Sequence, residues 1–251
     1  MKRAVITGAA TGIGYAIARR LAALGYEIII IGRSAEKLET AARQLGAGGA
    51  KGKVIPLVID VKDSKSLVDA LGDMGPFDAM VASAGICTQA ALDDPDADEV
   101  WDEVLSVNLN GVWNTFKAVI PHMNTDGRAV VISSGLGKLG RPGYSAYTAS
   151  KHAVLGLVKC LSMELAGKRI TVNAVCPGWV NTEMAGRDLV RTATSIGQSV
   201  EDVKKAALDN IPLERFVEAD EVAALVLWLL SKDAAAVTGQ AYNMSCGEFF
   251  A

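Results

Sequence analysis

Short apolar runs alternate along the chain with longer stretches in which hydrophobic residues recur at helical spacing. The short runs are rich in β-branched residues, which is typical of strands in a parallel sheet whose two faces are both covered. The longer stretches predict helices between those strands. The pattern therefore predicts an α/β fold, a Rossmann-like doubly wound parallel sheet of about seven strands with helices on both faces. The predicted strands are Arg3–Thr7, Glu27–Ile31, Val54–Ile59, Ala79–Ala82, Ala129–Ser133, Ile170–Ala174 and Ala241–Asn243.

Two stretches interrupt this alternation. Gly135–Gly143 is a glycine-rich loop. Val180–Pro212 mixes polar and apolar residues and predicts a helical lid insertion near residues 180–212, because loops of this length in compact domains are often lids or binding segments. A surface insertion without function is the alternative. No linker composition divides the chain, so residues 1–251 are expected to form a single domain. The predicted helices are Gly14–Leu24, Ala35–Leu45, Ser64–Leu71, Glu99–Val107, Gly111–Met123, Ala146–Glu164 and Ala219–Leu230.

The composition argues against several classes of function but does not identify one. The net charge of -3 over 251 residues argues against nucleic acid or an anionic membrane surface as the main partner. No segment approaches the roughly 18 unbroken apolar residues of a membrane span. The N-terminus reads as a strand and not as a secretory signal, so we expect a cytoplasmic location. The 4 cysteines are scattered and there are only 2 histidines, so no metal site is predicted.

A glycine-rich segment, Thr7–Gly14, lies between the first predicted strand and the first predicted helix. Its spacing is Gly-x-x-x-Gly-x-Gly. Glycines allow a tight turn here and let backbone N–H groups approach a pyrophosphate at the helix N-terminus. A tight turn without a ligand is the alternative interpretation. The residues predicted to contact a nucleotide are Gly8, Thr11, Gly12, Ile13 and Gly14.

The end of the second predicted strand carries Gly32 and Arg33, at a point where many NAD-binding folds have an acidic residue for the adenosine ribose. A guanidinium without a carboxylate beside it suits the 2′-phosphate of NADP, although an exposed arginine in a turn would look the same. Asp60 closes the third strand, where it could accept a hydrogen bond from adenine or cap the following helix. The sequence therefore favours NADP(H), with NAD(H) as the alternative.

Tyr147 and Lys151 lie one helical turn apart, so their side chains should project from one face of a helix. A neighbouring ammonium lowers the pKa of a phenol, which would let Tyr147 exchange a proton with a carbonyl or alcohol oxygen. Ser134, at the end of the fifth strand, could orient that oxygen, and the amide of Asn108 could anchor backbone or water. Each residue also has an ordinary interpretation: an exposed helix face, a polar strand end or a helix break.

Taken together, these residues resemble the short-chain dehydrogenase/reductase family, and the resemblance covers essentially the whole chain. The glycine motif matches Thr7–Gly14, and the segment Pro177–Met184 fits the family's Pro-Gly-x-x-x-Thr-x-Met. The residues that match the family's active-site set in order and spacing are Asn108, Ser134, Tyr147 and Lys151.

The resemblance implies a reaction and a set of contacts. A nicotinamide delivers hydride to a carbonyl carbon while Tyr147 donates a proton to the oxygen, and Ser134 orients that oxygen and stabilises its developing charge. Lys151 holds the nicotinamide ribose, and Asn108 holds a water that links Lys151 to solvent. The further cofactor-binding residues implied in this way are Val61, Ala84, Gly85, Pro177, Gly178, Val180, Thr182 and Met184.

One position departs from the family pattern. The family usually has Asn-Asn-Ala-Gly after the fourth strand, whereas this chain has Ala82–Gly85 with the sequence Ala-Ser-Ala-Gly. The family's asparagine braces the central sheet near the adenosine ribose, and Ser83 reaches less far. We expect an intact fold with slightly altered cofactor contacts.

Substrate choice is expected to depend on the glycine-rich loop, Trp179 and the lid. Apolar residues in these segments suggest an apolar pocket, although ordinary core packing explains each of them as well. Four basic residues of the lid, Arg187, Arg191, Lys204 and Lys205, could meet an acidic or phosphate-bearing substrate, or simply form a solvated helix face. The predicted substrate residues are Leu136, Leu139, Tyr144, Trp179 and Met184.

The sequence around Tyr147 and the segment Val237–Asn243 look like those of β-ketoacyl and aromatic-polyketide ketoreductases. We therefore predict an NAD(P)(H)-dependent oxidoreductase that interconverts a ketone and a secondary alcohol, with a β-keto compound or its acyl thioester as substrate. One alternative is an NAD-dependent secondary-alcohol or 3-hydroxyacyl-CoA dehydrogenase, which Arg33 disfavours because it indicates NADP. The other alternative is a catalytically silent nucleotide-binding subunit. The resemblance implies a homotetramer, with a dimer or a hetero-oligomer with a homologue as the alternatives.

Overall fold

The computed structural model describes residues 1–250, and in it the predicted strands form one parallel sheet. The 7 strands lie in the order β3-β2-β1-β4-β5-β6-β7. The chain builds outward from β1 in one direction and then returns to add β4 on its other side, which places a topological switch point between β1 and β4. The predicted doubly wound α/β fold is confirmed. The strands are β1 Arg3–Thr7, β2 Glu27–Gly32, β3 Val54–Val58, β4 Phe77–Ala82, β5 Met123–Ile132, β6 Thr171–Pro177 and β7 Ala241–Met244.

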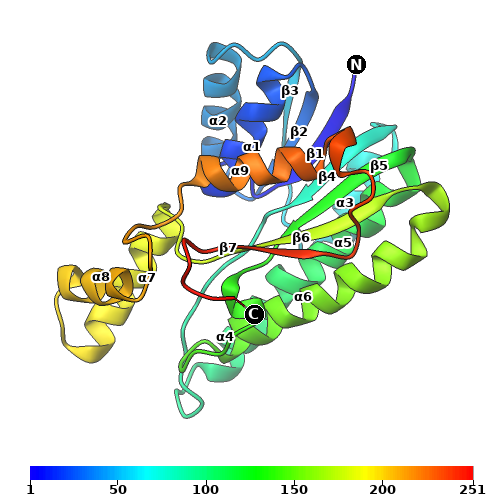
Figure 1. The fold of residues 1–251 in the computed structure, drawn as a ribbon. Coiled ribbons are helices and arrows are strands. Elements are labelled where there is room, and N and C mark those ends of the chain that lie inside the picture. Colours follow the sequence, from blue (N-terminus) through cyan, green and yellow to red (C-terminus); the bar gives the residue numbers. More distant parts are fainter. Residues whose placement is uncertain (251) are drawn as a thin grey trace.

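Helices cover both faces of this sheet (Figure 1). Helices α1, α2 and α9 pack on one face, and α3, α5 and α6 pack on the other. Right-handed crossovers between parallel strands produce this two-sided cover. The helices are α1 Gly12–Ala23, α2 Ala35–Ala47, α3 Ser64–Gly72, α4 Ala97–Leu105, α5 Gly111–Val119, α6 Ser145–Glu164, α7 Glu183–Ile196, α8 Val200–Asp209 and α9 Ala219–Leu229.

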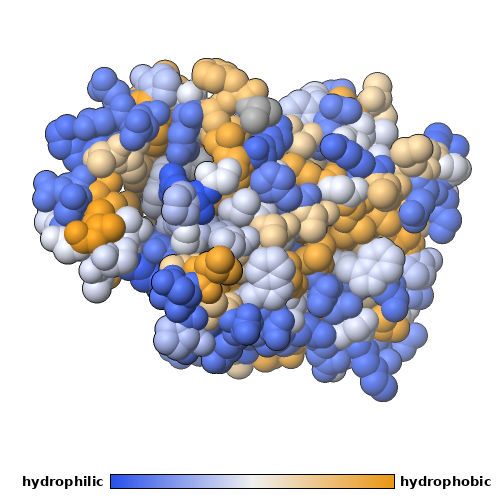
Figure 2. Space-filling view, turned by 90° about the horizontal axis from the view of Figure 1, so that it is seen from below, coloured by the Kyte–Doolittle hydropathy of each residue, from blue (hydrophilic) through white to orange (hydrophobic). Residues whose placement is uncertain are grey.

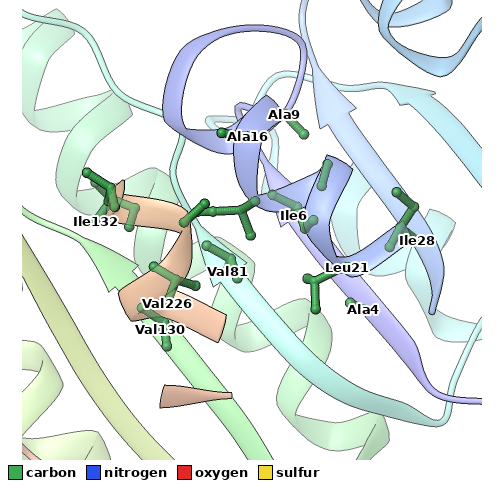
Figure 3. Packing of buried hydrophobic residues seen from close by; sticks show 14 of the residues in the cluster. Ala4, Ile6, Ala9, Ala16, Leu21, Ile28, Val81, Val130, Ile132 and Val226 are labelled. Carbon is green, nitrogen blue, oxygen red and sulfur yellow. The ribbon is translucent and has the colours of Figure 1, made fainter. Parts of the chain in front are cut away.

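The two cores are separated by the alternation of side chains along each strand. On β1, Ala4 and Ile6 point into the core under α1 and α9, whereas Val5 points into the core under α5 and α6. Figure 3 shows the first core, where Leu21 of α1 and Val226 of α9 lie among the strand residues. Fully burying an aliphatic side chain of this size contributes about 1.5–3 kcal/mol. The uninterrupted apolar strands are therefore what holds the sheet between its two helical layers.

The largest error in the predicted elements lies between α5 and β5. The helix predicted to reach Met123 ends at Val119 and is followed by a 3₁₀ turn over Ile120–His122, because Pro121 cannot continue the α-helical hydrogen bonds. The strand predicted to begin at Ala129 instead begins at Met123. Its pairing with β4 shifts register between Phe77 and Ala79, which accommodates the irregular start.

The stretch predicted as a lid is helical and projects from the body of the molecule as α7 and α8, at the left of Figure 1. Thr182 caps the N-terminus of α7, and Ser199 caps that of α8. The two helices share a small core of Leu189, Ala193 and Val203, against which Trp179 and Phe216 of the body pack. The lid is therefore attached through few apolar contacts compared with the two cores of the sheet.

The surface seen from below alternates between hydrophilic and hydrophobic areas, and the projecting lid carries a hydrophobic patch of its own (Figure 2). Val190 and Ile196 of α7 are exposed hydrophobic residues of that segment. No helix within residues 1–250 is both long and apolar enough to cross a bilayer.

Candidate active site

One cavity of about 550 Å³ brings together almost all the predicted site residues. It lies at the carboxyl ends of the central strands, where doubly wound sheets bind their ligands, and α7 borders it. Of the predicted catalytic, cofactor and substrate residues, Asn108 alone is not part of its wall. The predicted residues that line it are Gly8, Thr11, Gly12, Ile13, Gly14, Arg33, Asp60, Val61, Ala84, Gly85, Ser134, Leu136, Leu139, Tyr144, Tyr147, Lys151, Pro177, Gly178, Trp179, Val180, Thr182 and Met184.

The nucleotide end of the cavity is made mainly of backbone. Gly8 has φ +68°, and a Cβ there would lie 2.7 Å from the backbone of Ala84, so the turns that follow β1 and β4 approach closely only because this residue is glycine. Helix α1 starts at this point without a side-chain cap and without an acidic residue in its first turn. Its N–H groups and the positive end of its dipole are therefore left for an anion. The loop fits the pyrophosphate of a dinucleotide.

The adenosine end carries positive charge at the start of α2. Arg33 is exposed and its Nη1 lies 3.8 Å from Glu103 Oε1. Ser34 caps α2 by accepting a hydrogen bond from the backbone N–H of Lys37, and both residues line the cavity beside Arg33. Ser34 and Lys37 were not predicted from the sequence. They follow Arg33 by one and four residues at the turn into α2, and this short spacing was the signal that could have indicated them.

Asp60 lines the cavity as predicted, but it does not cap the following helix. Its Oδ1 accepts a hydrogen bond from the backbone N–H of Lys62 at 2.9 Å and closes a turn. Asp63 provides the cap of α3 by accepting from the backbone N–H of Ser66. The capping alternative was therefore wrong for Asp60, because the strand ends one turn earlier than the helix begins.

Tyr147 and Ser134 meet in the wall of the cavity, one from the first turn of α6 and the other from the end of β5. Burial raises the pKa of Tyr147 well above its usual range, the nearby Cys87 and Asp188 raise it further, and the hydrogen bond with Ser134 lowers it. The expected lowering of this pKa by Lys151 is not found. The phenol is therefore held in its protonated form, which is the form that donates a proton.

Lys151 is buried beneath Tyr147, with its Nζ 5.6 Å from the centre of the tyrosine ring. The ammonium donates a hydrogen bond to the carbonyl of Ile132 at 3.0 Å. Burial lowers the pKa of Lys151 to about 8, because a charged amine is costly to remove from water. A Cβ on Gly85 would lie 3.5 Å from the same Nζ, so glycine keeps the space above the ammonium open.

Asn108 is fully buried in the π-helical turn Ser106–Asn110, behind the wall of the cavity. Its Oδ1 accepts from the N–H of Ile86, its Nδ2 donates to the carbonyl of the same residue, and Nδ2 also donates to Ser150 Oγ at 3.2 Å. Of the two predicted uses of this amide, the structure shows the anchoring of backbone. Asn108 thereby ties the loop after β4 to α6.

The substrate end combines apolar and polar side chains, so the prediction of an apolar pocket was incomplete. Trp179 stacks on Phe216 with ring centres 5.5 Å apart. Tyr144 is buried, but its hydroxyl donates to Asp188 Oδ2 at 2.8 Å and faces Gln89. Asp188 comes from α7 and was not predicted from the sequence. It lies one helical turn before Thr192, and the amide of Gln89 donates to both side chains. This contact depends on the packing of α7 over the cavity, which the spacing within α7 does not show.

Two of the four basic residues of the lid, Arg187 and Lys205, form ion pairs within their own helices. Arg187 Nη1 lies 3.0 Å from Glu183 Oε1, and Lys205 Nζ lies 2.7 Å from Asp209 Oδ2. All four side chains are largely exposed. The solvated-face interpretation therefore describes these residues better than a phosphate site does.

The C-terminal segment also reaches the cavity, which sequence analysis did not predict. Glu248 and Phe249 line it, and the ring of Phe249 fills the space beside Gly135 so closely that a Cβ there would collide with it. Arg141 stands over the rings of Tyr144 and Trp179, and its Nη2 lies 3.8 Å from Glu248 Oε1. Within residues 1–250 no group of three or more His, Cys, Asp or Glu is placed to hold a metal ion.

Three features together define a dinucleotide-binding oxidoreductase. The sheet is doubly wound, and a helix N-terminus that is rich in glycine and has no side-chain cap lies at its switch point. A tyrosine, a lysine and a serine lie in the same cavity. The family model described as short chain dehydrogenase matches residues 2–191. The chain belongs to this family of oxidoreductases, which use NAD(P)(H).

Known proteins of this family match nearly the whole chain. The 3-oxoacyl-(acyl-carrier-protein) reductase of Thermotoga maritima is 37% identical over 98% of this chain and 97% of its own length. The D-beta-hydroxybutyrate dehydrogenase of Rhizobium meliloti is 34% identical, covering 98% of each chain. A crystal structure of an actinorhodin polyketide ketoreductase variant with NADPH superimposes with a TM-score of 0.91 at 36% identity, covering 98% of this chain and 97% of that one.

Proposed function

We propose that the chain is an NADPH-dependent ketoreductase that reduces the keto group of a β-keto ester or acyl thioester to a secondary alcohol. The observation that carries this proposal is the position of the half-buried phenol of Tyr147 beside Ser134, in the same cavity as the nucleotide loop. The likeness to a 3-oxoacyl reductase and to a polyketide ketoreductase supports the choice of substrate. We further propose that residues 1–251 act as one NAD(P)-binding domain.

When bound, the nicotinamide cofactor would supply a hydride to the carbonyl carbon. Backbone N–H groups at the start of α1 would hold its pyrophosphate, and Lys151 would hold its nicotinamide ribose. Ser134 Oγ orients the ketone oxygen, and Tyr147 transfers its phenolic proton to that oxygen as negative charge develops there. The carbon gains the hydride, the oxygen gains the proton, and the phenolate that remains is reprotonated from solvent. Lys151, with a pKa of about 8, is a suitable donor for that return.

The preference for NADPH rests on the start of α2. Arg33, Ser34 and Lys37 together offer two cations and a hydroxyl at one point of the cavity wall. No carboxylate stands at Gly32, where one would bind a free ribose hydroxyl and repel a phosphate. Arg33 and Lys37 face Glu103 and Glu183 at 3.8 and 3.6 Å, and these exposed pairs are weak enough to be exchanged for a phosphate.

The test is a redox assay with NADPH and NADH against ethyl acetoacetate, an acyl-thioester analogue and simple secondary alcohols, using the wild-type chain and Tyr147→Phe. We expect reduction of the β-keto compounds with NADPH and a loss of at least about a hundred-fold in kcat in the variant, since general acid catalysis is worth that much or more. The affinity for NADPH, measured by calorimetry, should change little. Substantial turnover by Tyr147→Phe would refute the assigned role.

A dehydrogenase that oxidises hydroxy acids is the second candidate, favoured by the relative named as a D-beta-hydroxybutyrate dehydrogenase. Faster oxidation of 3-hydroxybutyrate with NAD than reduction of any ketone with NADPH would support it. Tight cofactor binding without turnover of any substrate would instead favour a silent nucleotide-binding subunit.

We also propose a homotetramer. Trp101 of α4 and Trp113 of α5 are exposed by 42% and 46%, and large aromatic residues on neighbouring helices are typical of subunit interfaces. Sedimentation velocity of the wild-type chain and of a Trp101→Lys variant tests this assembly. A monomer at micromolar concentration would contradict it.

A further inference from the structure

Asp188 is a buried carboxylate at the substrate end of the cavity. Only 8% of the residue is exposed, and it belongs to the cavity wall. Both of its oxygens accept hydrogen bonds: Oδ2 from the hydroxyl of Tyr144 at 2.8 Å, and Oδ1 from the amide of Gln89 at 2.7 Å. The thiol of Cys87 lies 3.9 Å from Oδ1. This pattern, in which every neighbour donates, fits an ionised carboxylate.

This carboxylate has no direct counter-ion in the described part of the chain. Within residues 1–250, Asp188 forms no ion pair with a lysine, arginine or histidine, and its hydrogen-bond partners are all neutral. A buried carboxylate solvated by neutral donors keeps its full charge in a poorly screened place. Its charge acts on the reacting phenol of Tyr147 as well as on its neighbour Tyr144, because it raises the pKa of both.

In the described part of the chain, the cations that border the same end have partners other than Asp188. Arg141 lies over two aromatic rings and faces Glu248, and Arg187 pairs with Glu183. Arg191 donates to the carbonyl of Cys87 at 2.9 Å, and Lys151 donates to that of Ile132. Glu248 adds a second carboxylate to the wall. Arg191 and Lys151 keep their positive charge on these neutral carbonyls, but within residues 1–250 neither forms an ion pair with Asp188, so its carboxylate has no direct counter-ion.

We propose that Asp188 determines substrate class by excluding β-keto acids, whose carboxylate lies one methylene from the reacting carbonyl. This inference rests on the proposed ketoreductase function and narrows it. A β-keto acid has its carboxylate one methylene from the ketone, so both groups must enter this cavity together. Like charges in a poorly screened site are strongly disfavoured, and such a repulsive element gives specificity against one ligand class. An ester or thioester is neutral at the same position and is admitted.

The proposal separates this chain from the hydroxy-acid activity named for one of its relatives. D-β-hydroxybutyrate and its ketone are anions, and a site for them needs a donor or cation to receive the carboxylate, whereas Asp188 is an acceptor. The buried carboxylate thus favours β-keto esters and thioesters over free β-keto acids as substrates.

The test compares acetoacetate with its neutral ethyl ester. Binding of each to the protein saturated with NADP⁺, which cannot reduce a ketone, is measured by calorimetry. We expect the wild-type chain to bind the ester at least about ten-fold more tightly than the acid. Asp188→Asn should narrow this ratio by about ten-fold. Equal binding of the two ligands by the wild-type chain would overturn the proposal, and this comparison stands even if the variant does not fold.

Two further variants test whether Asp188 acts through its negative charge or through its structural contacts. Tyr144→Phe removes a hydrogen bond to Asp188 but leaves the charge, so the ratio of ester to acid affinity should persist. A purely structural role of Asp188 in holding the lid would make Tyr144→Phe and Asp188→Asn alter that ratio alike. Asp209→Asn makes the same charge change at an exposed position of α8 outside the cavity, and it should leave the ratio at the wild-type value.

Turnover with NADPH is measured in parallel. If the ester binds preferentially but is not reduced, the proposed reaction fails while the charge-based exclusion stands. If the ester is reduced and acetoacetate is reduced equally well, the exclusion fails while the reaction stands.

Discussion

The nucleotide end and the substrate end of the cavity are built in different ways. The pyrophosphate loop of the nucleotide end comes from one short segment, in which Gly8 and Gly14 let backbone approach backbone and α1 presents free N–H groups. The substrate end comes from side chains of distant segments, with Gln89, Tyr144 and Asp188 joined by hydrogen bonds. A backbone site serves one constant ligand and tolerates little change, whereas a side-chain site can be altered one residue at a time.

The largest expected effect tests the rigidity of the backbone site. In Gly14→Ala, the new Cβ would collide with the carbonyl oxygen of Gly8 and lie 3.1 Å from Ala9 Cα. Overpacking of this kind costs about 1–3 kcal/mol, and the loop has to move away from the ligand. We expect NADPH affinity to fall by at least about ten-fold and the melting temperature to decrease, measured by calorimetry and thermal unfolding.

The matched control is Gly186→Ala in α7, where an added Cβ meets nothing within 4 Å. This variant should bind NADPH normally and gain up to about 1 kcal/mol of stability, since alanine is the better helix former. If both variants lost NADPH affinity and melting temperature equally, the glycine loop would be no less tolerant of substitution than α7.

The second prediction concerns a side chain placed at the nucleotide end. Arg33→Ala removes a guanidinium that would make charge-assisted hydrogen bonds to a 2′-phosphate, each worth about 1.5–3 kcal/mol. NADPH affinity should fall by about ten-fold or more, while NADH affinity changes little. The control is Arg43→Ala, an exposed position of α2 outside the cavity. Equal losses for both cofactors would contradict the assignment.

The smallest expected effect is a dependence on pH. The pKa of Lys151 is lowered from 10.5 to about 8 by burial, so its ammonium is lost as the pH rises through that value. Because Tyr147 stays protonated there, kcat/KM for ketone reduction should fall above about pH 8 through Lys151.

The same group affects stability with a defined sign. Between about pH 8 and 10.5 the unfolded chain keeps the proton that folded Lys151 has released. The free energy of unfolding contributed by this group therefore rises over that interval. Denaturant unfolding of the wild-type chain and of Lys151→Met between pH 7 and 10 checks it, and identical pH profiles for the two proteins would refute it.

Most of the fold could be predicted from the local sequence. Strands and helices were predictable because buried parallel strands such as Ile28–Ile31 read as continuous apolar runs. The errors fell where local signals compete, as at the end of α5, where Pro121 stops a helix that the hydrophobic pattern would continue. The nucleotide loop was predictable for a related reason: its geometry depends on glycines within one contiguous segment.

The sequence by itself determined the sheet, the glycine loop and the set of residues that meet around Tyr147, since each depends on neighbours close in the chain or on a fixed strand order. Only the tertiary structure decided three features. Burial raised the pKa of Tyr147 against the expected effect of Lys151, the amide of Asn108 was committed to backbone, and Asp188 came to lie in the substrate cavity. Each feature depends on which distant segments pack together and on how much water they exclude. Neither the packing nor the exclusion of water can be predicted from the local sequence.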